Sequence, residues 1–185
     1  MVRYLLTRSH LAVLLVMLAA GVATAQNDTI YTARLSGFNE VGPINNNSGA
    51  ILTEGTGRVQ LEVGPNSATY TLTYSGLTSN VLQSHIHFGK KHNAGGVMVF
   101  LCTNLGNGPA GTPACPAAGG TVTGTITGAS VIAVPTQNVP AGNFGAVLAA
   151  LHSDTAYVNV HTANFPGGEI RGQVRVRHDD HDRDH

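Results

Sequence analysis

The sequence has no excess of charge of either sign. Its 185 residues carry 10 Lys and Arg against 10 Asp and Glu. If a leader containing Arg3 and Arg8 is removed, the formal net charge of the remaining chain is 8 − 10 = −2 with histidine neutral. Proteins that bind nucleic acid or an anionic membrane surface concentrate positive charge. The composition favours neither, so we expect no nucleic-acid partner.

Long runs of Leu, Glu, Lys and Ala at helical spacing are also missing. Glycine is abundant, at 23 residues, and Thr and Val alternate in patches, which is typical of strands joined by tight turns. One short helix is predicted at 141–152. Strands are predicted at 29–35, 57–63, 68–74, 81–88, 97–101, 121–127, 156–161 and 169–176. The predicted fold class is all-β, an antiparallel Greek-key β-sandwich or barrel of about eight strands with one short helix.

The one long apolar run lies near the amino end, at 11–20. Two arginines precede it and small residues ending in Ala25 follow it, which predicts a signal peptide over residues 1–25. We expect an exported protein, secreted or periplasmic, with no membrane span in the mature chain. A single domain is predicted over 26–177, followed by a disordered tail rich in His and Asp over 178–185. The tail is also a candidate for weak binding of divalent metal.

The sequence has only two cysteines, Cys102 and Cys115, on either side of a loop rich in Gly, Pro and Asn. An exported protein with an even cysteine count favours a disulfide, because oxidising compartments preserve one. Metal binding by this pair is the weaker alternative, since neither cysteine has a second ligand at close spacing.

Histidines occur in two strand-like segments about seventy residues apart. The first, 84–89, contains His85 and His87, and the second, 157–162, contains Asn159 and His161. Side chains two apart on a strand lie on the same face, so each pair projects together. The spacing is compatible with metal ligands or with a polar network.

Strand alternation also predicts which residues face the core. In 81–88, Leu82, Ile86 and Phe88 are expected inside and the two histidines outside. In 169–176, Glu169 and Arg171 are expected on the outer face. If these strands are neighbours, all these polar side chains converge on one outer face.

Two interpretations of this convergence stay open. Imidazole suits copper and zinc, so His85, His87 and His161 could form a mononuclear site for either ion. Alternatively, the histidines form a hydrogen-bonded network with Asn159, Glu169 and Arg171 that fixes strand register. In that network Glu169 and Arg171 are expected to form salt bridges, with each other or with a neighbour, and Glu40 is a further acidic candidate.

Nucleophilic catalysis has no sequence support. Ser84 has the core phase, opposite to its adjacent histidines. There is no Gly-x-Ser-x-Gly elbow and no phosphate-cradling glycine loop. Hydrolase activity is therefore disfavoured.

Four ordered segments resemble a known family. Residues 33–41, 85–89, 157–162 and 168–172 are similar to the signature of the CHRD domain, which is named after chordin and also occurs alone in secreted microbial proteins. The resemblance covers roughly residues 30 to 176 and implies an extracellular β-sandwich module. A fainter similarity is to copper/zinc superoxide dismutase, which also places a His-x-His pair on one strand and a further histidine downstream.

These observations lead to two functional hypotheses. The first is an exported, non-enzymatic module with a binding or structural role toward an unknown extracellular protein or surface partner. The second is a copper- or zinc-binding protein using His85, His87 and His161, with superoxide dismutase type chemistry as one form of it. The second requires the three imidazoles to share one coordination sphere, whereas a binding module needs an exposed patch or an open sheet edge.

Overall fold

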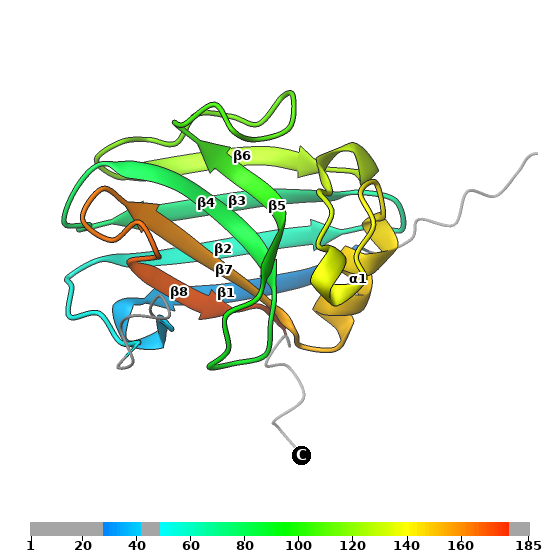
Figure 1. The fold of residues 1–185 in the computed structure, drawn as a ribbon, viewed down its shortest axis with the longest axis horizontal. Coiled ribbons are helices and arrows are strands. Elements are labelled where there is room, and N and C mark those ends of the chain that lie inside the picture. The colour runs from blue at the N-terminus through cyan, green and yellow to red at the C-terminus, as the bar shows by residue number, and fades with distance from the viewer. Residues whose placement is uncertain (1–27, 42–48, 178–185) are drawn as a thin grey trace, which may run out of the picture.

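The computed structural model describes residues 28–41 and 49–177 (Figure 1). One α-helix, α1 (Phe144–His152), and three short 3-10 helices, η1 (Gly37–Asn39), η2 (Gly128–Ser130) and η3 (Pro135–Gln137), accompany the strands. The strands are β1 (Thr29–Ser36), β2 (Thr56–Val63), β3 (Ala68–Ser75), β4 (Val81–Phe88), β5 (Gly96–Thr103), β6 (Gly120–Ile126), β7 (Ala156–Thr162), β8 (Ile170–Gln173) and β9 (Arg175–Val176). The predicted signal peptide and the 178–185 tail lie outside the described residues.

The strands form one antiparallel sheet that curls into a nearly closed barrel. Their order is β5-β4-β7-β8-β1-β2-β3-β6, with β9 paired to β1. The two end strands, β5 and β6, contact each other, and Tyr70 on β3, the neighbour of β6, donates to the Leu101 carbonyl on β5. The all-β prediction, with its strand count and single helix, is confirmed.

Alternating side chains fill the barrel. Strand β3 shows this most simply, because its buried and exposed residues alternate without exception. Helix α1 closes one end, as Figure 1 shows, and buries Phe144, Val147 and Leu151. Its first turn is capped by the Asn143 side chain, which accepts a hydrogen bond from the Ala146 amide. The interior is therefore apolar, and the polar motifs must lie elsewhere.

A bulge changes the strand phase expected for β4. The pairing with β7 shifts between Val81 and Gln83, so Leu82 is out of step with the rest of the strand. Val81 is buried in the core and Leu82 is half-buried, so the prediction that Leu82 shares the core face is wrong. After the bulge, Ser84 and Ile86 face the interior and are fully buried.

The predicted strand 169–176 is divided in two. Strand β8 ends at Gln173 and β9 begins at Arg175. The intervening Val174 is buried and its amide donates to the Ala156 carbonyl. The chain thereby leaves β7 and continues beside β1.

Cys102 and Cys115 form a disulfide, as predicted. Their Cα atoms are 5.1 Å apart and both side chains are buried. Between them, Asn104 holds the loop by bonding the Val81 and Cys115 carbonyls and accepting from the Cys115 amide. The hydrogen bond from Asn104 to Val81 thus holds the loop after β5 against the start of β4.

Removing this disulfide is expected to lower the free energy of unfolding by about 3 kcal/mol, because the bond closes a loop between cysteines that are 13 residues apart. Urea unfolding of the Cys102→Ala/Cys115→Ala variant measures the change. An unfolding midpoint equal to that of the oxidised wild-type protein would contradict this prediction.

No helix among residues 28–41 and 49–177 has both the length and the apolar character needed to cross a lipid bilayer.

Candidate metal centre

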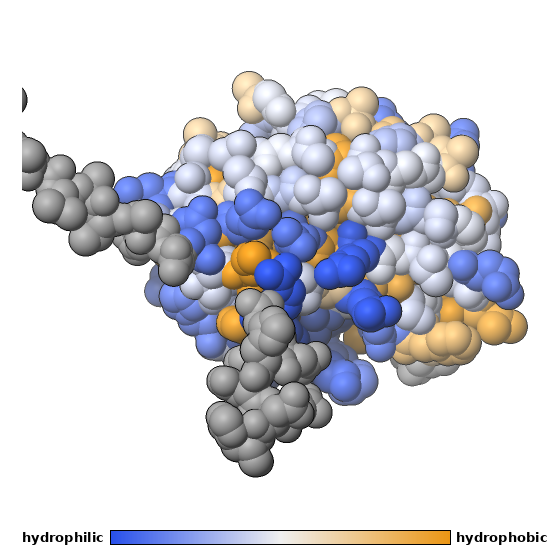
Figure 2. Space-filling view, turned by 180° about the vertical axis from the view of Figure 1, so that it is seen from behind, coloured by the Kyte–Doolittle hydropathy of each residue, from blue (hydrophilic) through white to orange (hydrophobic). Residues whose placement is uncertain are grey.

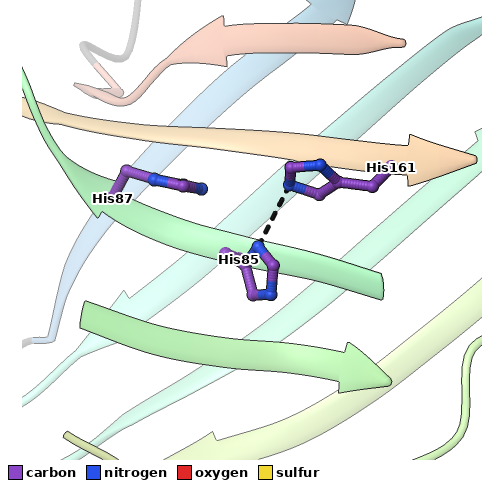
Figure 3. A group of neighbouring side chains, drawn as sticks. All are labelled: His85, His87 and His161. Atoms are coloured by element: carbon purple, nitrogen blue, oxygen red, sulfur yellow. Dashed lines mark hydrogen bonds between the residues drawn. The ribbon is translucent and has the colours of Figure 1, made fainter. Parts of the chain in front are cut away.

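Strands β4 and β7 bring the three predicted histidines together. His85 and His87 come from β4 and His161 from the neighbouring β7, where it pairs with Gln83 (Figure 3). One ring nitrogen from each histidine lies within 4.8 Å of the others. Three nitrogens on one tetrahedral ion are about 3.4 Å apart at bond lengths of about 2.0 to 2.1 Å. Side-chain rotations that move the nitrogens closer by up to about 1.4 Å would therefore bring all three onto one ion.

These histidines lie on the face opposite the core, but they are not exposed. Relative exposure is 2% for His85 and 7% for His87 and His161. Connecting loops cover them: Gly95 from the β4–β5 loop and Pro166 from the β7–β8 loop both contact the imidazoles. The outer face is therefore a second, polar interior.

Hydrogen bonds to backbone carbonyls fix the tautomers of two of the rings. Nδ1 of His87 lies 2.9 Å from the Gly95 carbonyl oxygen, and Nδ1 of His161 lies 2.9 Å from that of Pro166. A carbonyl oxygen only accepts, so both Nδ1 atoms carry the proton. In the neutral rings each Nε2 then carries the lone pair, which has no partner in His87 but in His161 faces Nδ1 of His85 at 3.1 Å and Oδ1 of Asn159 at 3.0 Å. Backbone hydrogen bonds of this kind orient metal-bound histidines.

The third ring completes the cluster. Nδ1 of His85 lies 3.1 Å from Nε2 of His161. Since the His161 nitrogen has a lone pair, it accepts a hydrogen bond from Nδ1 of His85. Nε2 of His85 and Nε2 of His87 are buried without any hydrogen-bond partner. A buried unpaired polar atom costs about 1 to 3 kcal/mol. The described chain thus leaves two buried nitrogen lone pairs unsatisfied in one cluster.

All three imidazoles are held neutral. Burial lowers the pKa of His85 to about 2, with the neighbouring His161 and His87 contributing by charge repulsion. Burial likewise lowers the pKa of His87 to about 4 and lowers that of His161. A neutral imidazole is the form that binds metal. The site therefore does not depend on removing protons at neutral pH.

The sequence comparisons bear on the whole barrel rather than on the cluster alone. A family model described as the CHRD domain matches residues 31–174. The chain belongs to the CHRD domain family. This confirms the resemblance carried by the four motifs, and it gives the chain the general character of an extracellular module. No curated protein and no solved structure matches this CHRD domain significantly.

Aromatic rings of the CHRD domain pack closely around the histidines. Tyr157 stacks on His87 with ring centroids 4.6 Å apart and an angle of 8°. The Arg171 guanidinium covers the other face of Tyr157, 3.4 Å from its centroid. Phe100 meets His85 edge to face at 4.4 Å. Tyr157 shares the strand phase of Asn159 and His161, so strand alternation predicts that its ring lies on their face. The position of Phe100 beside His85 follows from the pairing of β4 with β5, which the sequence does not display.

Glu169 and Arg171 do not pair with each other. The buried Glu169 carboxylate accepts hydrogen bonds from the hydroxyls of Thr53, Thr78 and Thr162 and from the Thr78 amide. Burial raises the pKa of Glu169, but these hydrogen bonds outweigh it and leave the pKa lowered. The prediction of a salt bridge is therefore wrong for Glu169, which instead links three chain segments through its hydrogen bonds.

Replacing Glu169 by Gln is expected to lower the free energy of unfolding by about 2 kcal/mol, because hydrogen bonds to a charged acceptor contribute about 1.5 to 3 kcal/mol. Chemical denaturation measures this change. The exposed Glu62→Gln variant is the matched control, and equal midpoints for the two variants would contradict the role given to Glu169.

Arg171 organises the loop over the site instead of binding a carboxylate directly. Its Nη2 donates to the carbonyls of Lys90 and Asn93, at 3.3 and 2.9 Å. This fixes the β4–β5 loop, which supplies the Gly95 carbonyl to His87. Gly95 has no room for a side chain, because a Cβ there would lie 1.9 Å from the Phe88 carbonyl oxygen.

The Glu40 side chain lies in the same polar interior, where an acidic member of the predicted hydrogen-bonded network would have to lie. Its side chain is buried, and Oε2 has no hydrogen-bond partner. Burial raises the pKa of Glu40 to about 7, against the lowering effects of the Arg171 charge and of hydrogen bonds from the Val41 amide and the Asn159 side chain. The Asn159 side-chain oxygen Oδ1 lies 3.0 Å from Nε2 of His161, so Asn159 lies between the carboxyl and the histidine cluster.

Proposed function

We propose that this CHRD domain is an exported module that binds one first-row transition-metal ion through His85, His87 and His161. The supporting observation is that one ring nitrogen from each of the three buried histidines lies within 4.8 Å of the others, and that the buried Nε2 of His87 has no hydrogen-bond partner. In Figure 3 it is Nδ1 of His85 that faces His161, so a cation would bind Nδ1 of His85, after its proton moves to Nε2 of the same ring, together with Nε2 of His87 and Nε2 of His161. The hydrogen bonds from Nδ1 of His87 and His161 to backbone carbonyls would hold the rings in orientation.

Copper is the metal we expect to bind most tightly. Imidazole is a good ligand for zinc, copper, iron and nickel, and affinities of such sites rise along the divalent series to copper and then fall at zinc. Three neutral histidines leave a coordination position for a further ligand. The metal would add charge and Lewis acidity, while the surrounding loops restrict access of water.

A dinuclear dismutase site receives less support. Within residues 28–41 and 49–177, His85, His87 and His161 form the one group of three or more His, Cys, Asp or Glu side chains close enough to share an ion. A second ion of the dismutase type would need its own ligands. We therefore propose a mononuclear centre.

Export is part of the proposal. The disulfide between Cys102 and Cys115 is compatible with an oxidising compartment, and CHRD domains are extracellular modules. The predicted signal peptide would deliver the protein there. A metal site in such a compartment would load from ions outside the cytoplasm.

Elemental analysis and calorimetric titration with copper and zinc test the proposal. The protein is the exported full chain with His178, His181 and His185 replaced by Ser, so that the tail cannot supply imidazoles. We expect one tightly bound equivalent of copper and weaker binding of zinc. Metal that binds the wild-type chain and is absent from the tail variant would contradict the proposed centre.

A further inference from the structure

A basic groove crosses the outer surface of the sheet, and none of the three clustered histidines lines it. Three adjoining hollows form it, of about 200, 390 and 430 Å³. The first and second share Arg34, and the second and third share Arg58 and Thr73, so the hollows are continuous. We call this surface the arginine groove and define it by Lys91, Arg171, Arg34, Arg58, Thr73 and Thr71.

Two of its arginines are placed directly opposite each other. Arg34 on β1 and Arg58 on β2 are register partners, and both are exposed. Like charges in this position destabilise a sheet. The one salt bridge found among residues 28–41 and 49–177 joins Arg175 to Asp154, so neither groove arginine is neutralised by a carboxylate there. Their positive charges are available to a ligand.

The buried Arg171 helps to bring a third cation to the groove. Its hydrogen bonds to Lys90 and Asn93 hold the β4–β5 loop, and Lys91 from that loop lines the same hollow as Arg34. The arrangement concentrates positive charge in a chain whose total formal charge is zero. Charge of this kind attracts anions.

Beyond the arginines the groove is lined by hydroxyls. Arg58 pairs in register with Thr73, and Thr71 follows on the same face of β3. Figure 2 shows strongly hydrophilic side chains near the middle of the face seen from behind, with a paler surface of intermediate hydropathy above them. An occupant of the groove thus meets cations first and then hydrogen-bonding hydroxyls.

We propose that the arginine groove binds an acidic polysaccharide through its sulfate or carboxylate groups. Arginine pairs with such oxyanions through two parallel hydrogen bonds, and threonine hydroxyls can bond sugar hydroxyls. Single-stranded nucleic acid fits less well, because its binding surfaces stack bases on aromatic rings. Tyr31 and Tyr70 are buried in the barrel, and Tyr74, which borders one of the hollows, is only 1% exposed, so none of these rings offers a stacking surface.

Affinity electrophoresis and calorimetry with dextran sulfate, polygalacturonate and neutral dextran test this. We expect one or both acidic polymers to bind and neutral dextran not to bind; comparison of the two identifies the preferred anion. With three exposed cationic contacts, Arg34, Arg58 and Lys91, counterion release predicts a loss of about 40-fold in affinity between about 50 and 200 mM salt. The Arg34→Gln/Arg58→Gln variant should bind more weakly and lose only about fourfold over the same range.

Arg175→Gln is the control, because Arg175 is already paired with Asp154 and lines none of the three hollows. It should bind like the wild type. Melting curves establish that each variant folds. Failure of both acidic polymers to bind, equal binding by the double variant, or equally tight binding of single-stranded DNA would overturn the proposal. None of these outcomes affects the metal proposal, since Arg34 and Arg58 lie outside the histidine cluster.

Discussion

Replacement of His87 by alanine is expected to lower copper affinity by more than about 100-fold. Loss of an outer-shell partner alone costs about 10- to 100-fold, so loss of a ligand should exceed that range. His87 is the clearest test, because its Nδ1 proton is committed to Gly95 and its Nε2 has no other partner. Calorimetric titration in the tail variant measures the affinity.

Two exposed histidines provide the matched control. His92 lies in the β4–β5 loop and His152 ends α1, and both are solvent-exposed and outside the cluster. Alanine at either position should leave copper affinity unchanged. If His87→Ala binds copper as tightly as His152→Ala, the three-histidine site is wrong.

The ion-free protein is expected to lose about 3 kcal/mol of unfolding free energy for each pH unit between about pH 6 and pH 5. In the folded state His85, His87 and His161 have lowered pKa values and stay neutral there, whereas in the unfolded chain they take up protons below about pH 6.5. Their stabilising contribution is present above that pH and lost as the pH falls.

Glu40 acts in the opposite direction. Its pKa is raised to about 7 in the folded state, so it binds a proton that the unfolded chain does not yet hold. The net difference is therefore 3 − 1 = 2 protons, each corresponding to about 1.4 kcal/mol per pH unit. Urea unfolding at several pH values in the presence of a chelator measures the slope.

A variant without one imidazole separates this account from general acid destabilisation. His85→Gln should reduce the slope by about one proton, whereas His152→Gln, at an exposed position, should leave it unchanged. Equal slopes for the wild type and His85→Gln would show that the cluster is not buried in its neutral form.

Strand alternation was sufficient to predict much of the fold and the grouping of the histidines. Val158 and Val160 are fully buried in the core, and Asn159 and His161 lie on the opposite face, as expected from a period of two. His85 and His87 lie together for the same reason, because β4 pairs with β7 without a register shift where these residues occur.

Local pattern could not predict what covers the outer face. The sequence gives no measure of how closely the Gly95 and Pro166 loops return to the strands, so strand alternation indicates an outer face but not that this face is buried. Burial decides the chemistry, because desolvation is what keeps the imidazoles neutral. Nor does sequence spacing reveal that Glu169 binds Thr53 and Thr78, which are 116 and 91 residues away, as well as the nearby Thr162.

X-ray absorption spectroscopy at the copper edge, on the copper-loaded tail variant, tests the central claim most directly. We expect one copper ion with three imidazole nitrogens at about 2.0 Å, reduced to two in His161→Ala. A copper ion without imidazole ligands, or a spectrum that His161→Ala leaves unchanged, would contradict it.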